Sequence, residues 1–158
     1  MAYWLFQANP KYSRILDGIG ELEGMHWLVT RYAKEIAVDD GVLIWVAGAH
    51  AGIYAIAQVT HATRFVDKPP DLDYWILPMR AIGRFYAPVR FTHKLLEQPI
   101  LKALLRHDPV LRGLQVIRTP HSTNFRVLPQ EWDRVQVLLG LGEGTKSKRI
   151  LPSMRLNG

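Results

Sequence analysis

Residues 42–59 read VLIWVAGAHAGIYAIAQV and decide the fold. The runs Val42–Ala47 and Ile53–Val59 are apolar and rich in β-branched and aromatic residues, which favour strands. The segment between them, Gly48–Gly52, begins and ends with glycine, as hairpin connections often do. The sequence therefore predicts a β-hairpin.

The strand pattern continues after the hairpin. We expect its second strand to run on through Thr60–Val66, long enough to bend around a barrel, until Pro69-Pro70 forces an exposed loop. Further strands are expected at Leu72–Pro78 and at Ile82–Leu95, the latter interrupted at Pro88. A partly closed sheet follows from these segments.

The two ends of the chain add shorter elements. Tyr3–Ala8 has the pattern of a strand, Lys11–Leu22 carries apolar residues at helical spacing, and His26–Thr30 is another extended segment. Downstream we expect a helix from Pro99 that buries Leu104, strands at Leu114–Arg118 and Phe125–Leu128, and a helix at Pro129–Leu139 that buries Trp132 and Leu138. The mixture predicts an α+β fold.

Composition narrows the class of protein. The chain has 158 residues, 48% hydrophobic and 22% charged, as in one globular domain. It has no cysteine, which excludes thiol nucleophiles, cysteine-ligated metals and redox disulfides. No apolar run approaches the roughly 20 residues that span a bilayer. The first residues lack the features of a signal peptide, so we expect a cytoplasmic protein without membrane contact.

Charge is distributed unevenly along the chain. Residues 1–79 carry 6 basic and 9 acidic side chains, a net charge of −3, whereas residues 80–158 carry 14 basic and 5 acidic ones, a net charge of +9. Such asymmetry is typical of a surface that meets a polyanion. We expect residues 141–158 to form a basic, flexible tail whose Lys146, Lys148 and Arg149 add cationic contacts.

Catalytic and metal-binding patterns are weak. The six histidines are scattered without metal-ligand spacing on a helix, and no glycine-flanked nucleophile elbow surrounds Ser122. Gly140–Lys146 resembles a phosphate-binding loop only loosely, because no strand is predicted before it and no helix after it. We therefore expect neither metal nor cofactor, and a binding domain rather than an enzyme. A hydrolase that uses His121 and Ser122 is the catalytic alternative.

The chain is rich in tryptophan, with five in a small domain. Trp4, Trp45 and Trp132 lie in apolar runs and are predicted to belong to the core. Trp27 and Trp75 lie next to polar segments, where an indole either packs in the core or forms one wall of an aromatic cage for a nucleobase. The sequence pattern leaves both alternatives open for these two residues.

Small polar side chains could complement such a cage. The loop His121-Ser122-Thr123-Asn124, together with Asn9, supplies donors and acceptors that suit the edge of a base. The same residue types also stabilise ordinary turns by bonding to their own backbone.

The order of these segments resembles the EVE domain, a member of the PUA-like superfamily, over residues 1–140. The resemblance is carried by Tyr3–Lys11 (YWLFQANPK), His26–Val29 (HWLV), Val42–Trp45 (VLIW) with Gly48, Ala51–Ala55 (AGIYA) and Ser122–Phe125 (STNF). It implies a curved or barrel-like mixed β-sheet flanked by short helices. It also implies a non-catalytic module similar to YTH and SRA-type readers, which hold a modified base in an aromatic pocket.

The resemblance also suggests roles for single residues. Trp27 matches the pocket tryptophan, Asn9 matches a polar residue at the end of the first strand, and Trp75 looks like the second cage tryptophan of YTH readers. Close relatives often read Pro-Gln-Gly-Thr-Asn-Phe where this chain has Pro120-His121-Ser122-Thr123-Asn124-Phe125, which puts base preference in question.

Together these observations predict a domain that flips a modified base, such as 5-methylcytosine in DNA, into a pocket. The alternative is a module that binds structured or modified RNA. A nuclease or ATPase encoded separately is a possible effector partner. The predicted base pocket comprises Asn9, Trp27, Leu28, Trp75, His121, Ser122, Thr123 and Asn124. The predicted phosphate contacts are Arg84, Arg90, Arg118, Arg126, Lys146, Lys148 and Arg149.

Overall fold

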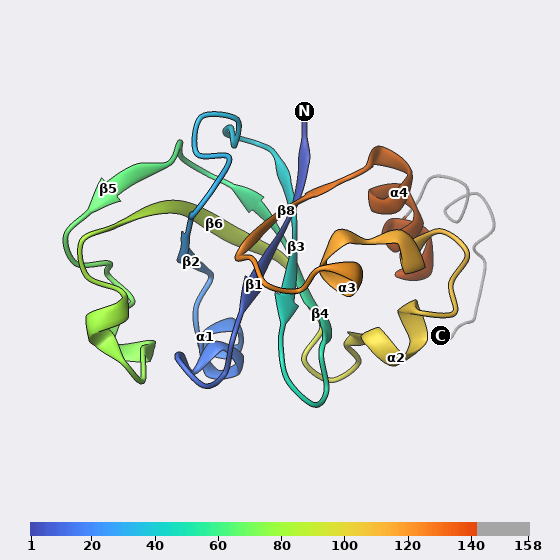
Figure 1. Ribbon diagram of the computed structural model, residues 1–158, viewed down its shortest axis with the longest axis horizontal. Coiled ribbons are helices and arrows are strands. Elements are labelled where there is room, and N and C mark those ends of the chain that lie inside the picture. The colour runs from blue at the N-terminus through green and yellow to red at the C-terminus, as the bar shows by residue number, and fades with distance from the viewer. Residues whose placement is uncertain (142–158) are drawn as a thin grey trace.

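The predicted hairpin forms the centre of the sheet in the computed structural model, which describes residues 1–141 (Figure 1). Strands β3 (Gly41–Val46) and β4 (Gly52–Val59) pair antiparallel, from Gly41 opposite Gln58 to Val46 opposite Gly52. Nearly every side chain of both strands is buried, which requires that other elements cover both faces of the sheet. The hairpin prediction is confirmed.

The remaining strands extend the sheet on both sides in the order β2-β6-β4-β3-β1-β8. β1 (Tyr3–Ala8) runs parallel to β3, and β8 (Asn124–Val127) pairs antiparallel with β1. On the other side, β6 (Arg84–Lys94) pairs with β4 and with β2 (Gly24–Leu28). The short strands are β5 (Arg64–Val66) on β6 and β7 (Ile100–Leu101) on β4.

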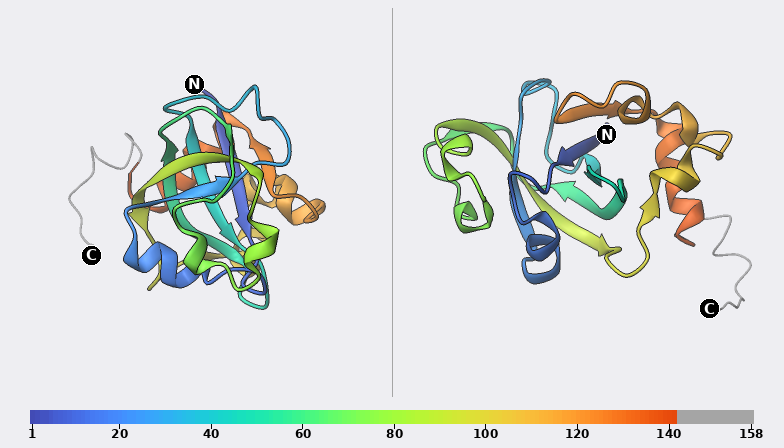
Figure 2. Two further views of the ribbon diagram at one scale, coloured as in Figure 1. Left: turned by 90° about the vertical axis from the view of Figure 1, so that its left-hand side faces the viewer. Right: turned by 60° about the horizontal axis from the view of Figure 1, so that its bottom comes forward.

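The sheet curls into a half-barrel with short helices around it (Figures 1 and 2). This confirms the expected α+β fold with a curved, barrel-like mixed sheet flanked by short helices. The helices are α1 (Ile15–Glu21), α2 (Lys102–Leu105), α3 (Gln115–Arg118) and α4 (Pro129–Leu138), and the 3-10 turns are η1 (Leu72–Tyr74), η2 (Pro78–Arg80) and η3 (Leu111–Gly113). None of the helices in residues 1–141 has the length and apolar character needed to cross a membrane.

The core has two parts, because side chains alternate between the two faces of a strand. Trp4 and Phe6 of β1 pack with Trp27, whereas Leu5 packs with Trp45 on the other face. Trp132 is half-buried and stacks on Tyr3, with ring centroids 4.7 Å apart, at the margin of the second part.

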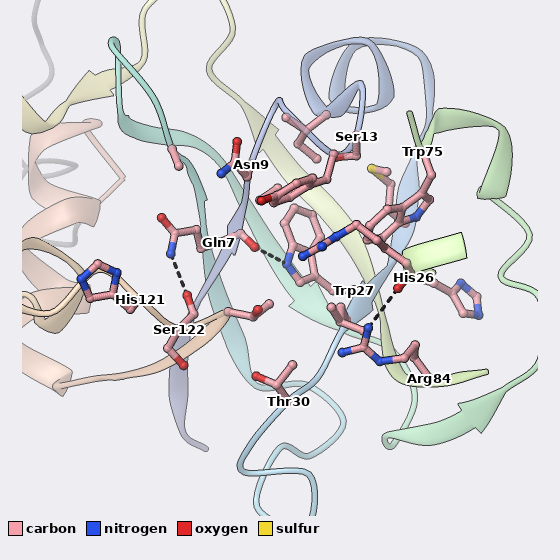
Figure 3. Close-up of a pocket in the computed structure, with 18 of the residues that line it drawn as sticks. Gln7, Asn9, Ser13, His26, Trp27, Thr30, Trp75, Arg84, His121 and Ser122 are labelled. Carbon is pink, nitrogen blue, oxygen red and sulfur yellow. Dashed lines mark hydrogen bonds between the residues drawn. The ribbon is translucent and has the colours of Figure 1, made fainter. Parts of the chain in front are cut away.

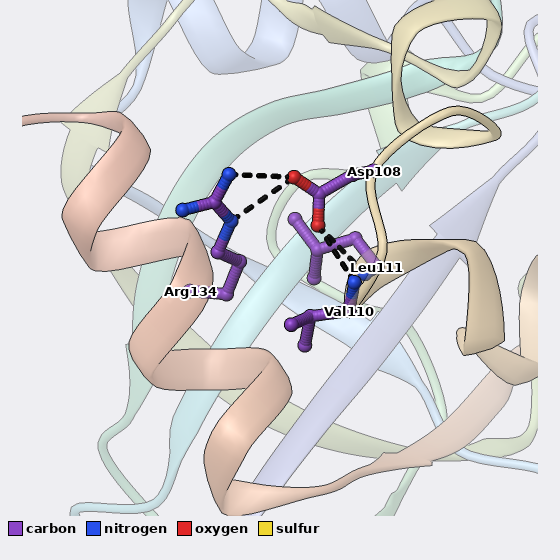
Figure 4. Close-up of polar contacts among 4 residues, drawn as sticks. All are labelled: Asp108, Val110, Leu111 and Arg134. Atoms are coloured by element: carbon purple, nitrogen blue, oxygen red, sulfur yellow. Dashed lines mark hydrogen bonds and ion pairs between the residues drawn. The ribbon is translucent and has the colours of Figure 1, made fainter.

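An ion pair holds α4 against the chain before η3 (Figure 4). Asp108 accepts hydrogen bonds from Arg134 Nη2 at 2.8 Å and from the backbone N–H groups of Val110 and Leu111 at 3.0 and 2.9 Å. The bond from Arg134 is the main reason why the pKa of Asp108 is lowered. Its contribution to stability is therefore present above the ordinary carboxyl pKa and is lost as the pH falls through the lowered value.

β2 lies very close to β6. A Cβ atom at Gly24 would be 2.2 Å from the carbonyl oxygen of Val89, a separation that no substitution could keep. Glycine at this position lets β2 bring Met25 and Trp27 against the sheet.

β4 ends earlier than predicted. Thr60–Thr63 form a loop between β4 and β5, while β6 runs through Pro88 without a break. The Thr60 N–H donates to the Pro88 carbonyl at 2.9 Å, but proline has no N–H to donate in return. The pairing with β4 stops there, and β6 continues with β5 as its partner. The break that the sequence predicts in β6 at Pro88 therefore occurs in the neighbouring strand β4, which ends at Val59.

Several short elements differ from prediction. Leu72–Pro78 forms no strand but contributes to the turns η1 and η2, and Leu114–Arg118 contains the helix α3. Ile100 and Leu101 pair with β4, so α2 begins only at Lys102 and leaves Leu104 exposed; Leu138 in α4 is exposed as well. Short apolar runs suit either a strand or a helix, and tertiary contacts decide between them.

We expect Asp40→Ala to lower the free energy of unfolding by about 2–4 kcal/mol. The buried Asp40 carboxylate accepts from Trp4 Nε1 at 2.8 Å and from the N–H groups of Ala2 and Ala37, which would all lose their partner. Urea denaturation measures the change. The control Asp73→Ala, at an exposed side chain, should leave stability within about 0.5 kcal/mol; an equal loss in both variants would contradict the assignment.

Candidate functional site

A pocket of about 580 Å³ opens beside the end of β1 (Figure 3). Its volume lies within the range of small-molecule sites. The walls come from the end of β1, the chain leading into α1, strand β2, the segment 75–84 and the loop 120–123. Of the predicted site residues, those that line the pocket are Asn9, Trp27, Leu28, Trp75, Arg84, His121, Ser122 and Thr123.

Trp27 belongs to the core and to the pocket wall at once. Its side chain is 4% exposed and packs near Phe6, yet it lines the cavity near the centre of Figure 3. Its Nε1 donates to the Gln7 carbonyl oxygen at 3.3 Å, which fixes the plane of the indole. Trp27 therefore packs in the core and also lines the pocket.

Trp75 is half-buried and comes from the segment between β5 and β6. It forms an isolated bridge with Ser13, and the N–H of Ile76 donates to the Tyr12 carbonyl at 2.8 Å. These backbone contacts attach the segment to the chain before α1 and place Trp75 at one side of the pocket, away from His121 (Figure 3).

Gln7 organises the opposite wall. Its Nε2 donates to the carbonyl oxygens of Pro120 and Ser122 at 3.0 and 2.6 Å, and its backbone N–H donates to Thr123. The loop is thereby held with His121, Ser122 and Thr123 along the pocket. No hydrogen bond joins His121 to Ser122 in the part of the chain that the structure describes; Ser122 Oγ lies 3.4 Å from the Asn124 carbonyl instead.

Asn124 does not line the pocket, in contrast to its predicted role. Its fully buried amide donates from Nδ2 to the Leu28 carbonyl at 3.1 Å and accepts the Thr30 N–H on Oδ1 at 2.8 Å. The side chain joins β8 to the end of β2 and is fully buried, so it is not exposed to the pocket. It positions Leu28 and Thr30, which line the pocket.

The cationic groups divide into two sets. Arg84 lines the pocket, and so does Arg80, which the sequence analysis did not single out. The guanidinium of Arg80 lies 3.9 Å from the centroid of the Tyr12 ring, and Arg84 Nη1 donates to the Arg80 carbonyl at 3.0 Å. Neither arginine forms an ion pair within residues 1–141. The signal that was missed is an arginine two residues after Pro78 and five residues after Trp75 in the sequence.

The other predicted phosphate contacts lie outside the lining. Arg90 donates to Gln58 on the sheet, Arg118 is exposed at the end of α3, and Arg126 is paired with Glu35 and lies over the Tyr32 ring. Lys146, Lys148 and Arg149, with the rest of the predicted tail after residue 141, lie outside the described residues.

The lining carries positive charge without a carboxylate to balance it. Its charged members are Arg80 and Arg84, with the histidines His26 and His121. Burial lowers the pKa of His26, opposed by Asp71, whose buried carboxylate accepts the His26 N–H at 2.8 Å. Burial therefore favours the neutral form of the His26 imidazole, whereas the two arginines supply permanent positive charge. Within residues 1–141 no three acidic or histidine side chains are placed to hold a metal ion.

Comparison of the sequence with known families shows the family to which the chain belongs. A sequence model of the EVE domain matches residues 2–138, and the chain belongs to the EVE domain family. No curated protein matches the chain.

Solved structures share the fold. A Pseudomonas syringae protein has a TM-score of 0.65 at 16% identity, covering 87% of this chain and 99% of that one. A hypothetical protein from Leishmania major has a TM-score of 0.64 at 16% identity, covering 87% and 94%. Human THYN1 protein, solved in complex with 5-methylcytosine containing DNA, has a TM-score of 0.63 at 12% identity, covering 87% and 97%.

We expect Asn124→Ala to lower the free energy of unfolding by about 1–3 kcal/mol, because the Leu28 carbonyl and the Thr30 N–H would lose their partner. Chemical denaturation measures this. Asn9→Ala is the matched control, since the Asn9 side chain bonds only the Lys11 N–H in an exposed turn. It should cost less than about 1 kcal/mol, and a larger loss at Asn9 than at Asn124 would refute the positioning role.

Proposed function

We propose that this domain binds nucleic acid and holds one modified base, extruded from duplex DNA, in the pocket of Figure 3. A modified cytosine such as 5-methylcytosine is the proposed base. The observation that carries the proposal is a pocket large enough for a nucleobase, with Tyr12, Trp27 and Trp75 in its walls and two arginines that form no ion pair within residues 1–141.

The aromatic walls supply the energy that extrusion requires. Each base stacked on an aromatic side chain gains about 1–3 kcal/mol, which offsets a large part of the cost of unpairing and unstacking. Trp27 cannot swing away, because its Nε1 is bonded to Gln7 and its ring is packed in the core. It contributes a fixed apolar surface to the pocket, and Trp75, on its separate segment, lines the pocket as well.

Polar groups around the rim provide selection and affinity. Asn9 and Thr123 lie where they can bond the base edge, and His121 and Ser122 extend the same wall. Arg80 and Arg84 suit the phosphates next to the extruded nucleotide. Because each role is a contact rather than a bond rearrangement, we propose binding without catalysis.

The comparison with human THYN1 supports the choice of ligand. That protein has the same fold and was solved with DNA that contains 5-methylcytosine. The basic second half of this chain, with 14 cationic and 5 anionic side chains in residues 80–158, is consistent with such a partner.

We expect Trp75→Ala to weaken binding of a duplex that contains one 5-methylcytosine about tenfold, because one stacking face is lost. Binding of the unmodified duplex should change less than about twofold. Fluorescence anisotropy with the two duplexes measures both. Trp132→Phe, a change at a tryptophan that stacks on Tyr3 outside the pocket lining, is the control and should leave both affinities unaltered.

Two results would contradict base reading. One is that the wild type binds the methylated and the unmodified duplex with equal affinity. The other is that neither affinity changes in Trp75→Ala or in Trp27→Phe. Tighter binding of an RNA of the same sequence would favour the RNA-binding alternative.

A second test concerns the arginines. We expect Arg80→Gln and Arg84→Gln each to reduce the slope of log K against log salt concentration by about 1, because one phosphate contact is lost in each variant. Arg126→Gln is the matched control, since Arg126 is already paired with Glu35. A salt titration from low to physiological concentration measures the slope. A larger change of the slope in Arg126→Gln than in Arg80→Gln and Arg84→Gln would place the phosphate contacts near Arg126 and not beside the pocket.

A further inference from the structure

A turn at the edge of the pocket exposes apolar side chains. The segment Ile76–Ile82, here called the 76–82 turn, lies in the loop that projects from the sheet between β5 and β6 (Figure 1). Met79 is 81% exposed, Ile76 50% and Leu77 46%. Together with Ile82, which is 37% exposed, these are four large apolar side chains without cover in one short turn, which is unusual for a surface with no partner.

The turn is firmly held despite its exposure. The N–H groups of Ile76 and Leu77 both point to the Tyr12 carbonyl, at 2.8 and 3.4 Å. Arg80 N–H donates to Leu77 at 3.0 Å, and Arg84 Nη1 donates to the Arg80 carbonyl at 3.0 Å. Pro78 restricts its own backbone within η2. The turn therefore presents its apolar side chains on a fixed support instead of folding them inward.

The same turn borders the pocket. Trp75 directly precedes Ile76, and Arg80 directly follows Met79, and both line the cavity. Consecutive Cα atoms are about 3.8 Å apart, so the Met79 backbone lies next to that of Arg80, whose exposed side chain forms part of the pocket rim. If a base enters the pocket from a duplex, the gap that it leaves in the stack faces this rim.

We propose that Met79, supported by Ile76 and Leu77, inserts into the duplex at the position vacated by the extruded base and packs against the flanking base pairs. This inference rests on the proposed function. Unstacking exposes apolar base faces, and an inserted apolar side chain covers them. Methionine is unbranched and polarizable, which suits a gap of variable shape. Arg80 and Arg84 beside the turn favour a polyanion as its partner over an apolar protein surface.

The test compares three forms of one target. These are a duplex with 5-methylcytosine paired to guanine, the same duplex with an abasic site opposite the 5-methylcytosine, and the 5-methylcytosine strand alone. We expect Met79→Ala to weaken binding of the paired duplex about tenfold, because the unstacking cost is no longer offset. The duplex with the abasic site still leaves a gap in the stack that Met79 fills, so it should lose affinity as well, whereas the single strand, which has no such gap, should change less than about twofold.

Two controls separate this effect from others. Leu104→Ala removes an apolar side chain that is 63% exposed on α2, outside the pocket lining, and should leave all three affinities unchanged. Trp75→Ala should weaken all three targets, because it removes a pocket wall. Sedimentation of wild type and Met79→Ala detects self-association through the turn.

Several outcomes overturn the inference. An equal loss on all three targets, or no loss on any, would exclude insertion at Met79 while leaving the pocket function intact. A dimer that disappears in Met79→Ala would assign the turn to a second copy of the chain. If the wild type prefers no form that contains 5-methylcytosine over its unmodified counterpart, the proposed function fails and this inference fails with it.

Discussion

The hydrogen bonds of Gln7 are the constraint on which the pocket depends. This residue lies in β1, and its carbonyl, its N–H and its side chain reach Trp27, Thr123, Pro120 and Ser122. Three segments far apart in the sequence are joined at one point. β1 itself is held between β3 and β8, so the rigid centre of the sheet sets the place of both the indole and the polar loop.

The second wall is built differently. The segment that carries Trp75 and the 76–82 turn attaches to the chain before α1 through backbone bonds at Ser13, Arg14 and Tyr12. One side of the pocket thus belongs to the sheet, and the other belongs to an insertion between two strands. The arginines of the basic second half differ in the same way. Arg126 is paired with Glu35 from the acidic first half, whereas Arg80 and Arg84, next to the second wall, have no such partner among the described residues.

The sequence was most informative where a local pattern and the tertiary structure agree. The hairpin of residues 42–59 is apolar throughout, and a strand buried on both faces needs that pattern. Trp27 could be identified as a wall residue by resemblance, but its double role depends on Gln7, 20 residues away. Asn124 resembled a turn residue because nothing local indicates that its amide meets Leu28, 96 residues distant. Tyr12 and Arg80 were missed for the same reason, since their contact exists only after the insertion folds over α1.

The glycine at position 24 limits how this family member could acquire new ligands. β2 touches β6 backbone to backbone there, so any side chain at position 24 would push the strand that carries Trp27 away from β6. The position of that wall is therefore fixed by the sheet. The other walls, in the segment between β5 and β6 and in the loop 120–123, lie outside the paired strands and can differ in length and sequence without moving them.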